Sequence, residues 1–403
     1  MSQLTDEQEL FRDSLRDFLE EEIAPDVDEK SDEALTKEEV IDYQTTMKEQ
    51  LGIGFAPDVA EEYFGDLYFY GIGSEEISRV WPSLNVTLNM SFPAMFVEYA
   101  SEQTQDAMMG KLESGEIIGG LAVSEPKSGT DTVNLSTTAE KDGDEYVLNG
   151  QKTWVSNAPI ADVMLVAAHS EESGAREMFL VDQENSPFET AELHKIGWKA
   201  SPTGEVYLDD VRVPEDNNLS QIISNALAEG QQLSEILPYP DSVLDLFFEL
   251  KPLNAIFAFM RTGMALMSVG IMQAALDDSI EYAKERESFG KPIGQHQLIQ
   301  EKLYEMKCDV ESSRHMAYHA LDLLGEADTD ARLFSSLAKG YACEKSVEAT
   351  YEAMQLHGAM GLSEEYPLER YFRDARVMTI PDGTTEVQKL IVGSEMLDMS
   401  AYA

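Results

Sequence analysis

The chain has 403 residues, of which 43% are hydrophobic, so it can bury two or three cores and is not a disordered protein. Its 76 Asp and Glu residues against 29 Lys and Arg give a formal net charge of −47, which argues against duplex nucleic acid as a partner because the phosphates would be repelled. Two cysteines are too few for a disulfide framework, and we find no signal peptide and no apolar run of membrane-spanning length. We expect a cytoplasmic protein with no membrane partner and no metal site.

The acidic charge is spread along the chain, as in Glu20-Glu21-Glu22 and Asp209-Asp210, and is not confined to a tail or to one patch that a basic partner would bind. Like charges at this density repel one another and destabilise a compact state. Salt at about 1 M shortens the Debye length to about 3 Å and removes most of that repulsion. We therefore interpret the composition as an adaptation to a high-salt cytoplasm, as in a halophile.

The first part of the chain predicts helices. Thr5 and Gln8 have the spacing of a capping box. The apolar residues that follow at helical intervals are Phe11, Leu15, Phe18 and Leu19. Helical patterns continue to about residue 120, and we assign residues 1–120 to an N-terminal helical domain.

From residue 121 the apolar pattern takes the two-residue period of strands. Tyr146 and Leu148 alternate, and Asn149-Gly150 predicts a hairpin-type turn, as Asp-Gly steps do elsewhere in this part. Short apolar runs at 163–166 and 206–208 predict further strands. We assign residues 121–225 to a middle antiparallel β domain.

After about residue 225 the helical period returns and persists. One face of a long predicted helix carries Met264, Met267, Ile271, Ala275 and Ile280. Such striping is typical of a helical bundle, and we assign residues 226–403 to a C-terminal helical bundle domain. The predicted fold class is therefore mainly α with a central antiparallel β domain.

Two short motifs in the β domain are candidates for ligand contacts. The segment Ser124-Glu125-Pro126 through Gly129-Thr130-Asp131 offers hydroxyl and backbone donors to a polar ligand, although alone it also fits an ordinary turn. Trp154 and Ser156 can present an aromatic face and a hydroxyl to a planar ring, and the alternative for Trp154 is a buried core position.

Two further motifs belong to the helical bundle. Arg286 beside Gly290, followed by His296-Gln297, can grip a pyrophosphate, or Arg286 can be a solvated helix end. The segment 355–361, Gln-Leu-His-Gly-Ala-Met-Gly, breaks a helix with small residues and lets backbone approach a ligand, as ordinary helix ends also do.

The last motif is Asp382-Gly383-Thr384, which follows a proline and precedes a helix. Asp382 can be the N-cap of that helix. On a loop beside an apolar pocket, its carboxylate can instead act as a general base.

In order and spacing these motifs resemble the acyl-CoA dehydrogenase family along nearly the whole chain. Ser124 through Asp131, Arg286 through Gly290 and Asp382-Gly383-Thr384 look like its three signatures, and 373–376 looks like the run before its catalytic loop. The resemblance implies an acyl-CoA dehydrogenase-like fold, an FAD cofactor and the α,β-dehydrogenation of an acyl-CoA thioester.

The resemblance also implies roles for individual residues. Those expected to line the isoalloxazine ring are Leu121, Val123, Ser124, Trp154 and Ser156, with Thr130 near the cofactor or the CoA group. Those expected to hold the pyrophosphate and adenosine, partly from a neighbouring subunit, are Arg286, Ser288, Phe289, His296, Gln297, Gln355 and Gly358. Thr384 and Glu386 would complete the cofactor site, and Thr130, Arg261 and Gly383 would contact the substrate.

In the implied reaction Asp382 removes the α-proton, a hydride passes from Cβ to flavin N5, and the product is the trans-2-enoyl-CoA. The implied partners are an acyl-CoA substrate, an electron-transfer flavoprotein as acceptor and further copies of the chain in a dimer of dimers, within fatty acid metabolism. The alternatives are an acyl-CoA oxidase or nitroalkane oxidase-like flavoenzyme, and a non-catalytic flavoprotein or CoA-binding scaffold.

Among the departures from the family pattern, four concern the base or the substrate. The family usually has glutamate at the position of Asp382, and relatives with the base on the long helix carry it where this chain has Met260. The segment between Pro214 and Arg261 is longer than usual and can reshape either the acyl pocket or a subunit interface. Residues 83–85 lack the arginine of glutaryl-specific relatives, which argues against a dicarboxylic substrate.

Overall fold

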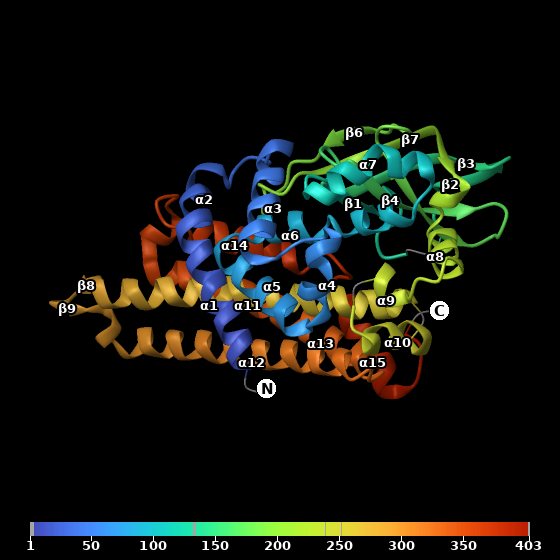
Figure 1. Cartoon of the computed structure of the whole chain (residues 1–403). Coiled ribbons are helices and arrows are strands. Elements are labelled where there is room, and N and C mark those ends of the chain that lie inside the picture. Colours follow the sequence, from blue (N-terminus) through green and yellow to red (C-terminus); the bar gives the residue numbers. More distant parts are fainter. Residues whose placement is uncertain (1–3, 132–133, 238, 251, 402–403) are drawn as a thin grey trace.

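The computed structural model of the chain describes residues 4–131, 134–237, 239–250 and 252–401 (Figure 1). The predicted order of helices, sheet and helices is confirmed. The N-terminal helices are α1 (Asp6–Phe18), α2 (Ala24–Lys30), α3 (Lys37–Leu51), α4 (Pro57–Gly65), α5 (Leu67–Val80), α6 (Pro82–Asn89) and α7 (Glu102–Ser114), with a π-helical turn Leu19–Ile23 and a 3-10 segment Phe92–Tyr99.

The predicted capping box at the start of α1 is present. The Gln8 N–H donates to Thr5 Oγ1 at 3.2 Å, and the Thr5 N–H donates to Gln8 Oε1 at 3.1 Å. These two bonds satisfy backbone donors that the first helical turn leaves without partners. Leu15 and Phe18 are buried on the inner face of α1, as their spacing predicts.

The described residues of the middle domain form one sheet of seven strands: β1 (Gly119–Ala122), β2 (Thr138–Asp142), β3 (Glu145–Ser156), β4 (Val163–Ser170), β5 (Arg176–Asp182), β6 (Glu189–Glu192) and β7 (Thr203–Pro214). The strand order is β1-β4-β2-β3-β7-β6, with β5 paired to β4. Most pairs are antiparallel as predicted, whereas β1 and β2 each run parallel to β4.

The predicted turn at Asn149-Gly150 is wrong. The hairpin turn between β2 and β3 is Gly143-Asp144, which the paired residues Asp142 and Glu145 flank, and Asn149 and Gly150 lie inside β3 at a bulge. A Cβ at Gly150 would stand 2.5 Å from Thr137 Oγ1. Glycine fits a crowded bulge as well as a turn, so the dipeptide alone does not separate the two.

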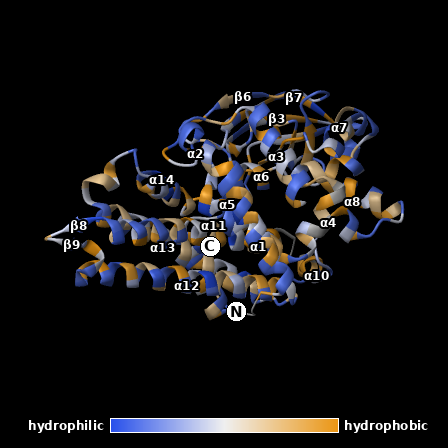
Figure 2. Cartoon of the chain, turned by 60° about the vertical axis from the view of Figure 1, so that its left-hand side comes forward, coloured by the Kyte–Doolittle hydropathy of each residue, from blue (hydrophilic) through white to orange (hydrophobic). Residues whose placement is uncertain are grey.

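The C-terminal domain is built on three long helices, α11 (Pro252–Glu285), α12 (Gln297–Gly325) and α13 (Ala331–His357), which lie side by side. The short helices that precede them are α8 (Leu219–Ala228), α9 (Leu233–Ile236) and α10 (Asp241–Glu249). The strands β8 (Glu287–Ser288) and β9 (Lys291–Pro292) join α11 to α12, and α14 (Leu368–Met378) and α15 (Thr385–Leu397) end the chain. Figure 2 shows apolar residues along these helices, interleaved with hydrophilic ones.

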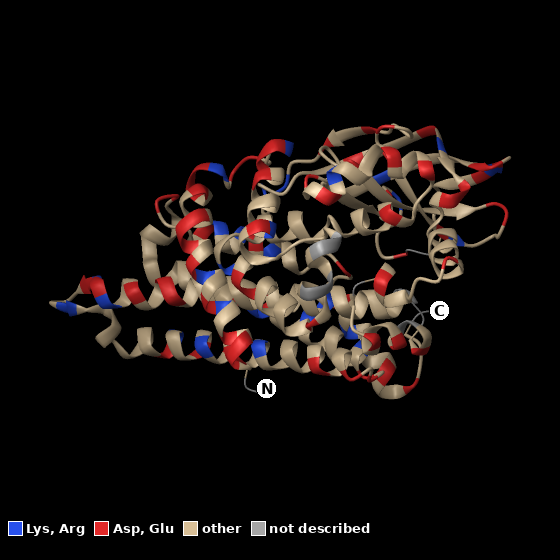
Figure 3. Ribbon diagram, in the orientation of Figure 1, with Lys and Arg blue, Asp and Glu red and all other residues tan. Residues whose placement is uncertain are grey.

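The expectation that no apolar segment reaches membrane-spanning length is wrong for α11. Residues Asn254–Glu285 are long and apolar enough by length and composition, with a mean hydropathy of 1.6. Of that segment's most apolar window, 78% is buried inside the protein, which is the pattern of a core helix. Figure 3 shows the acidic residues on all three parts of the molecule.

Candidate active site

The loop between α14 and α15 carries Asp382 in a backbone conformation that L-residues rarely adopt. Its φ is +56°, in the left-handed region, and Gly383 follows with a φ of +93°. Non-glycine residues in this region cost free energy and persist only where their surroundings hold them. The N-cap of α15 is Thr384, whose Oγ1 accepts from the Val387 N–H at 3.5 Å, so Asp382 is not the cap.

Three side chains from different elements hold this turn by its carbonyl oxygens. Arg261 Nε on α11 donates to Asp382 O at 3.2 Å, and Lys339 Nζ on α13 donates to Gly383 O at 2.8 Å. Gln388 Nε2 donates to both oxygens, at 3.0 and 2.8 Å. Arg261 is 7% exposed and Lys339 fully buried, so two cations stand inside the protein behind the turn.

The side-chain carboxylate of Asp382 is not held, as its backbone is, by hydrogen bonds from the described residues. Among the described residues no hydrogen bond to its side chain is present, and burial raises its pKa, while the positive charges of Lys339 and Arg261 oppose that rise. A carboxylate with unused lone pairs and a raised pKa can accept a proton from a ligand.

An aromatic cluster joins α4, α5 and α11 to the segment that precedes α10. We define it as Phe64, Tyr70, Tyr239 and Phe259. Tyr70 on α5 stacks on Phe259 of α11 at 4.4 Å between ring centroids, and Tyr239 meets Phe259 and Phe64 edge-on at 5.1 and 6.0 Å. Burial and, to a smaller degree, the charge of Asp382 raise the pKa of Tyr70, so Tyr70 is the member of the cluster that the carboxylate influences. Tyr239 comes from the long segment between Pro214 and Arg261.

In the β domain the structure brings together Leu121, Val123 and Ser124 with Trp154 and Ser156. The Thr153 N–H donates to Ser124 O at 2.9 Å, which ties the segment after β1 to β3. A second bulge in β3 shifts the register between Lys152 and Val155. Trp154 has a φ of +59° there, and its side chain is 61% exposed, so it is not a core tryptophan. Thr130 is exposed on the loop that follows Ser124.

A buried ion pair anchors this same corner, and the sequence analysis did not assign it a role. Lys152 Nζ donates to Glu125 Oε1 at 2.8 Å and to Val123 O at 3.2 Å, and both charged side chains are buried. The Glu125 carboxylate also accepts from the Ser136 N–H and hydroxyl and from the Thr137 N–H, at 2.7, 2.5 and 2.9 Å. Burial favours a higher pKa for Glu125, but these donors outweigh it and lower the pKa below its ordinary value.

The third group of predicted residues lies at the far end of the bundle. Arg286, Ser288, Phe289, His296 and Gln297 sit at the β8–β9 connection, where the ring of Phe289 is 95% exposed at a φ of +53°.

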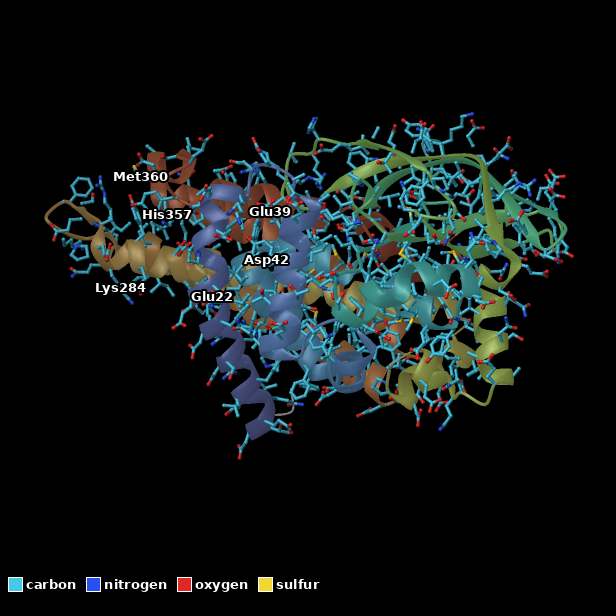
Figure 4. The ribbon with its side chains drawn as sticks, turned by 45° about the horizontal axis from the view of Figure 1, so that its top comes forward. Glu22, Glu39, Asp42, Lys284, His357 and Met360 are labelled. Carbon is cyan, nitrogen blue, oxygen red and sulfur yellow. The ribbon has the colours of Figure 1, made fainter. Side chains whose placement is uncertain are left out.

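Gln355 and Gly358 lie at the end of α13. Tyr282, near the end of α11, donates to His357 O at 3.3 Å and so joins the ends of α11 and α13. Figure 4 shows His357, Met360 and Lys284 in this end of the molecule.

Within one chain the structure does not unite all the predicted cofactor residues. The β8–β9 connection and the β domain stand at opposite ends of the molecule (Figure 1). Trp154 and Phe289 therefore cannot contact the same part of one ligand in a single chain. Thr384 lies with Asp382 at the start of α15, and Glu386 is exposed there.

Lys339, Gln388 and Lys152 are site residues that the sequence analysis missed. Lys339 lies on a stripe of α13 whose other buried members are small: Ser335, Ser336, Ala338, Ala342 and Cys343. A lysine on such a stripe is the signal that was available, because lysine is almost never fully buried without a partner.

In comparisons with known proteins, three domain models of a single family match successive parts of the chain. Its models describe the acyl-CoA dehydrogenase N-terminal domain, matching residues 5–116, the middle domain, matching 120–211, and the C-terminal domain, matching 252–397. The matched ranges leave residues 212–251 between them, and this interval contains α8, α9 and α10.

Individual relatives cover nearly the whole chain. The glutaryl-CoA dehydrogenase of Desulfococcus multivorans is 33% identical over 98% of this chain and 97% of its own length. The structure of butyryl-CoA dehydrogenase from Megasphaera elsdenii has a TM-score of 0.80 at 29% identity, covering 98% of this chain and all of that one. A structure described as the electron transferring flavoprotein of Acidaminococcus fermentans has a TM-score of 0.81 at 27% identity, covering 98% and 99% of the two chains.

Proposed function

Because the chain belongs to the acyl-CoA dehydrogenase family, we propose that it removes hydrogen from Cα and Cβ of an acyl-CoA thioester, with Asp382 as the base for the α-proton. The family's members are FAD-dependent oxidoreductases, and this chain is one of them. The observation that carries the proposal is the Asp382 turn, whose backbone is held by buried donors while its carboxylate has no hydrogen bond among the described residues.

The residues present fit FAD. Trp154 and Phe289 leave large rings exposed at positive φ, an arrangement that suits a planar ligand and costs stability without one. When bound, FAD supplies the two-electron acceptor for the hydrogen lost from Cβ. We assign the ring end to Leu121, Val123, Ser124, Trp154 and Ser156, and the pyrophosphate and adenosine end to Arg286, Ser288, Phe289, His296, Gln297, Gln355 and Gly358.

The separation of these two groups supports an assembly. Since the β domain and the β8–β9 connection lie at opposite ends of one chain, we propose that each FAD is held between two copies in a homo-oligomer, a dimer of dimers. Light scattering of the holoprotein tests this proposal, and a stable monomer that retains FAD would contradict it.

The chemistry then falls to the chain's own residues. Asp382 accepts the α-proton, and its raised pKa brings its proton affinity nearer to that of a weak carbon acid than an exposed aspartate would offer. Arg261, Lys339 and Gln388 keep the shorter aspartate side chain on a fixed turn, which matters because small misplacement of a base lowers the rate. The aromatic cluster excludes water from the region beside the carboxylate.

For the substrate we propose an acyl group that is not dicarboxylic. Asn85 of α6, in the segment where glutaryl-specific relatives have arginine, is buried and donates to Ser74 O and Ser78 Oγ at 3.0 and 2.7 Å, so no cation comes from this position. We place the acyl end toward the aromatic cluster, whose Tyr239 comes from the interval that the family models leave unmatched.

The test is anaerobic titration of the purified protein in molar KCl with a panel of acyl-CoA thioesters of different length, branching and terminal charge. Bleaching of the visible flavin band by one class of thioester is the expected result and identifies the substrate. A flavin-loaded protein that no thioester bleaches would contradict the proposal. Steady-state turnover with oxygen alone separates the alternative of an oxidase or nitroalkane oxidase-like enzyme, which we do not expect, since we propose an electron-transfer flavoprotein as acceptor.

The charge of −47 supports the further proposal of a high-salt cytoplasm. The unfolding temperature is expected to rise steadily between dilute buffer and molar KCl. An unfolding temperature independent of KCl would contradict it.

A further inference from the structure

We propose that Lys339 is a positioning residue for the reaction: its buried ammonium group holds the Asp382–Gly383 turn and supplies a positive charge beside the Asp382 carboxylate. The inference rests on the proposed role of Asp382 and adds a side chain from the middle of α13, far along the chain from the loop that it serves.

The surroundings of Lys339 accommodate a long side chain. It lies on the inner face of α13, is fully buried, and has Ser335, Ser336 and Cys343 as neighbours on the same face. These small residues leave room for the lysine stem to extend along the core to the turn. Burying an ammonium group costs free energy unless partners compensate it, and Gly383 O at 2.8 Å is its hydrogen-bond acceptor.

The titratable groups that act on Lys339 come from α11, from the loop, from α15 and from its own helix α13. Arg261 on α11 repels it, whereas Asp382 on the loop and Glu386 on α15 attract it, and Cys343 lies on its own helix. Burial lowers the pKa of Lys339, and Cys343, followed by Asp382, opposes that fall. In the reverse direction, Lys339 is the largest influence opposing the burial of Asp382. The pair is therefore coupled through charge although no hydrogen bond joins the two side chains.

The three donors are distributed over the two carbonyl oxygens of the turn. Asp382 O accepts from Arg261 and Gln388, whereas Gly383 O accepts from Lys339 and Gln388. Removing Lys339 leaves each carbonyl at least one donor, so the turn retains partners. What is lost is one anchor of Gly383 and the cation with the larger effect on the Asp382 carboxylate, so the proton affinity of Asp382 must rise.

The experiment compares Lys339→Met and Lys339→Arg with Lys345→Met, a control on the same helix whose lysine pairs with surface carboxylates. The readout is the rate of anaerobic flavin reduction by the thioester, measured across pH. In Lys339→Met we expect the acid limb of the pH–rate profile to move to higher pH by about one unit. At pH values below the midpoint of that limb, the rate should then fall about tenfold. Lys339→Arg keeps the charge, so its midpoint stays while its rate falls, and Lys345→Met changes neither.

A uniform loss of rate in Lys339→Met with an unmoved midpoint would overturn the proposal, because it would show packing alone. If Lys339→Met does not fold, the test uses Lys339→Arg, where a moved midpoint would also overturn it.

A second readout separates this proposal from the proposed function. The carboxyl carbon of Asp382 in 13C-labelled holoprotein, identified by its loss in Asp382→Asn, reports the protonation of that group without turnover. Its midpoint is expected to rise in Lys339→Met whether or not any thioester reduces the flavin, and an unchanged midpoint would contradict the role of Lys339.

Discussion

Glu125 in the β domain is buried and Asp382 in the C-terminal domain is partly buried, each carboxylate has a fully buried lysine nearby, and the hydrogen bonds around the two carboxylates differ. The Glu125 carboxylate accepts directly from Lys152, Ser136 and Thr137, and these donors lower its pKa. The Asp382 carboxylate accepts no hydrogen bond among the described residues, and burial raises its pKa.

The difference lies in what the cation holds. Lys152 binds the carboxylate itself, so Glu125 is saturated and serves as an anchor for the segment that carries Val123 and Ser124. Lys339 binds the backbone beside the carboxylate, so it fixes the position of Asp382 and leaves its oxygens for a ligand. A carboxylate beside a buried lysine is thus structural or reactive according to whether its donors reach the side chain or the main chain.

The largest effect that sharpens this comparison is on activity. Asp382→Asn keeps the shape and removes the base, and we expect the rate of flavin reduction to fall by about 10³-fold or more. The control is Asp398→Asn, an exposed aspartate that also has a left-handed φ, at 49°, and should leave the rate unchanged. If Asp382→Asn retains most of the activity, another residue is the base. If the wild type and the variant both lack activity, the protein is a non-catalytic scaffold.

The next effect is on stability. Lys152→Met leaves the buried Glu125 charge without its cation, and we expect the free energy of unfolding to fall by about 3–5 kcal/mol. The measurement is chemical denaturation in molar KCl, with Lys345→Met as the surface control. Adding Glu125→Leu to Lys152→Met should recover part of the loss. A loss below about 1 kcal/mol would make Glu125 and Lys152 no stronger than a surface pair.

Acid titration should give the two carboxylates opposite signs. The folded-state pKa of Glu125 is lowered, so its contribution to stability is present above the unfolded pKa of about 4.3 and is lost as the pH falls. The folded-state pKa of Asp382 is raised, so its ionised form costs stability at neutral pH and the cost disappears on acidification. We expect Glu125→Gln to destabilise the holoprotein at pH 7 and Asp382→Asn to be neutral or slightly stabilising. Equal destabilisation by both would contradict the assignment.

The smallest effect concerns salt. The coupling free energy between Glu125 and Lys152 should hardly change from low to molar KCl, because buried charges are screened little. The matched surface pair is Arg212 with Glu145, both about half exposed, whose coupling should be below about 1 kcal/mol and vanish in molar KCl. Double-mutant cycles measure both, and equal salt dependence would remove the distinction between buried and surface charge.

Much of the fold followed from local patterns. Three features were predicted because each depends on residues close together in the sequence. They are the capping box of Thr5 and Gln8, the strand period after residue 121 and the apolar face of α11. The incorrect prediction of a turn at Asn149-Gly150 shows where local patterns fail. A bulge and a turn both need the backbone freedom of glycine, so the dipeptide does not distinguish them. Lys339 and Lys152 were missed for a different reason. Their partners lie 44 and 27 residues away, and nothing local distinguishes a buried lysine from a solvated one.

The exposure of Trp154 also lay beyond the pattern. Its place in a strand fitted both a core and a ligand-facing position, and the register shift after Lys152 turned it outward. The position of Asp382, in contrast, followed from its motif, while the donors that hold its backbone did not.

The most direct test of the difference between the two carboxylates is exchange of the α-hydrogens of an acyl-CoA thioester with D₂O, followed by NMR on dithionite-reduced holoprotein, in which dehydrogenation cannot proceed. We predict exchange with the wild type and with folded Glu125→Gln, and none above background with Asp382→Asn. Exchange at the wild-type rate in Asp382→Asn would show that another group removes the proton, and would contradict the account.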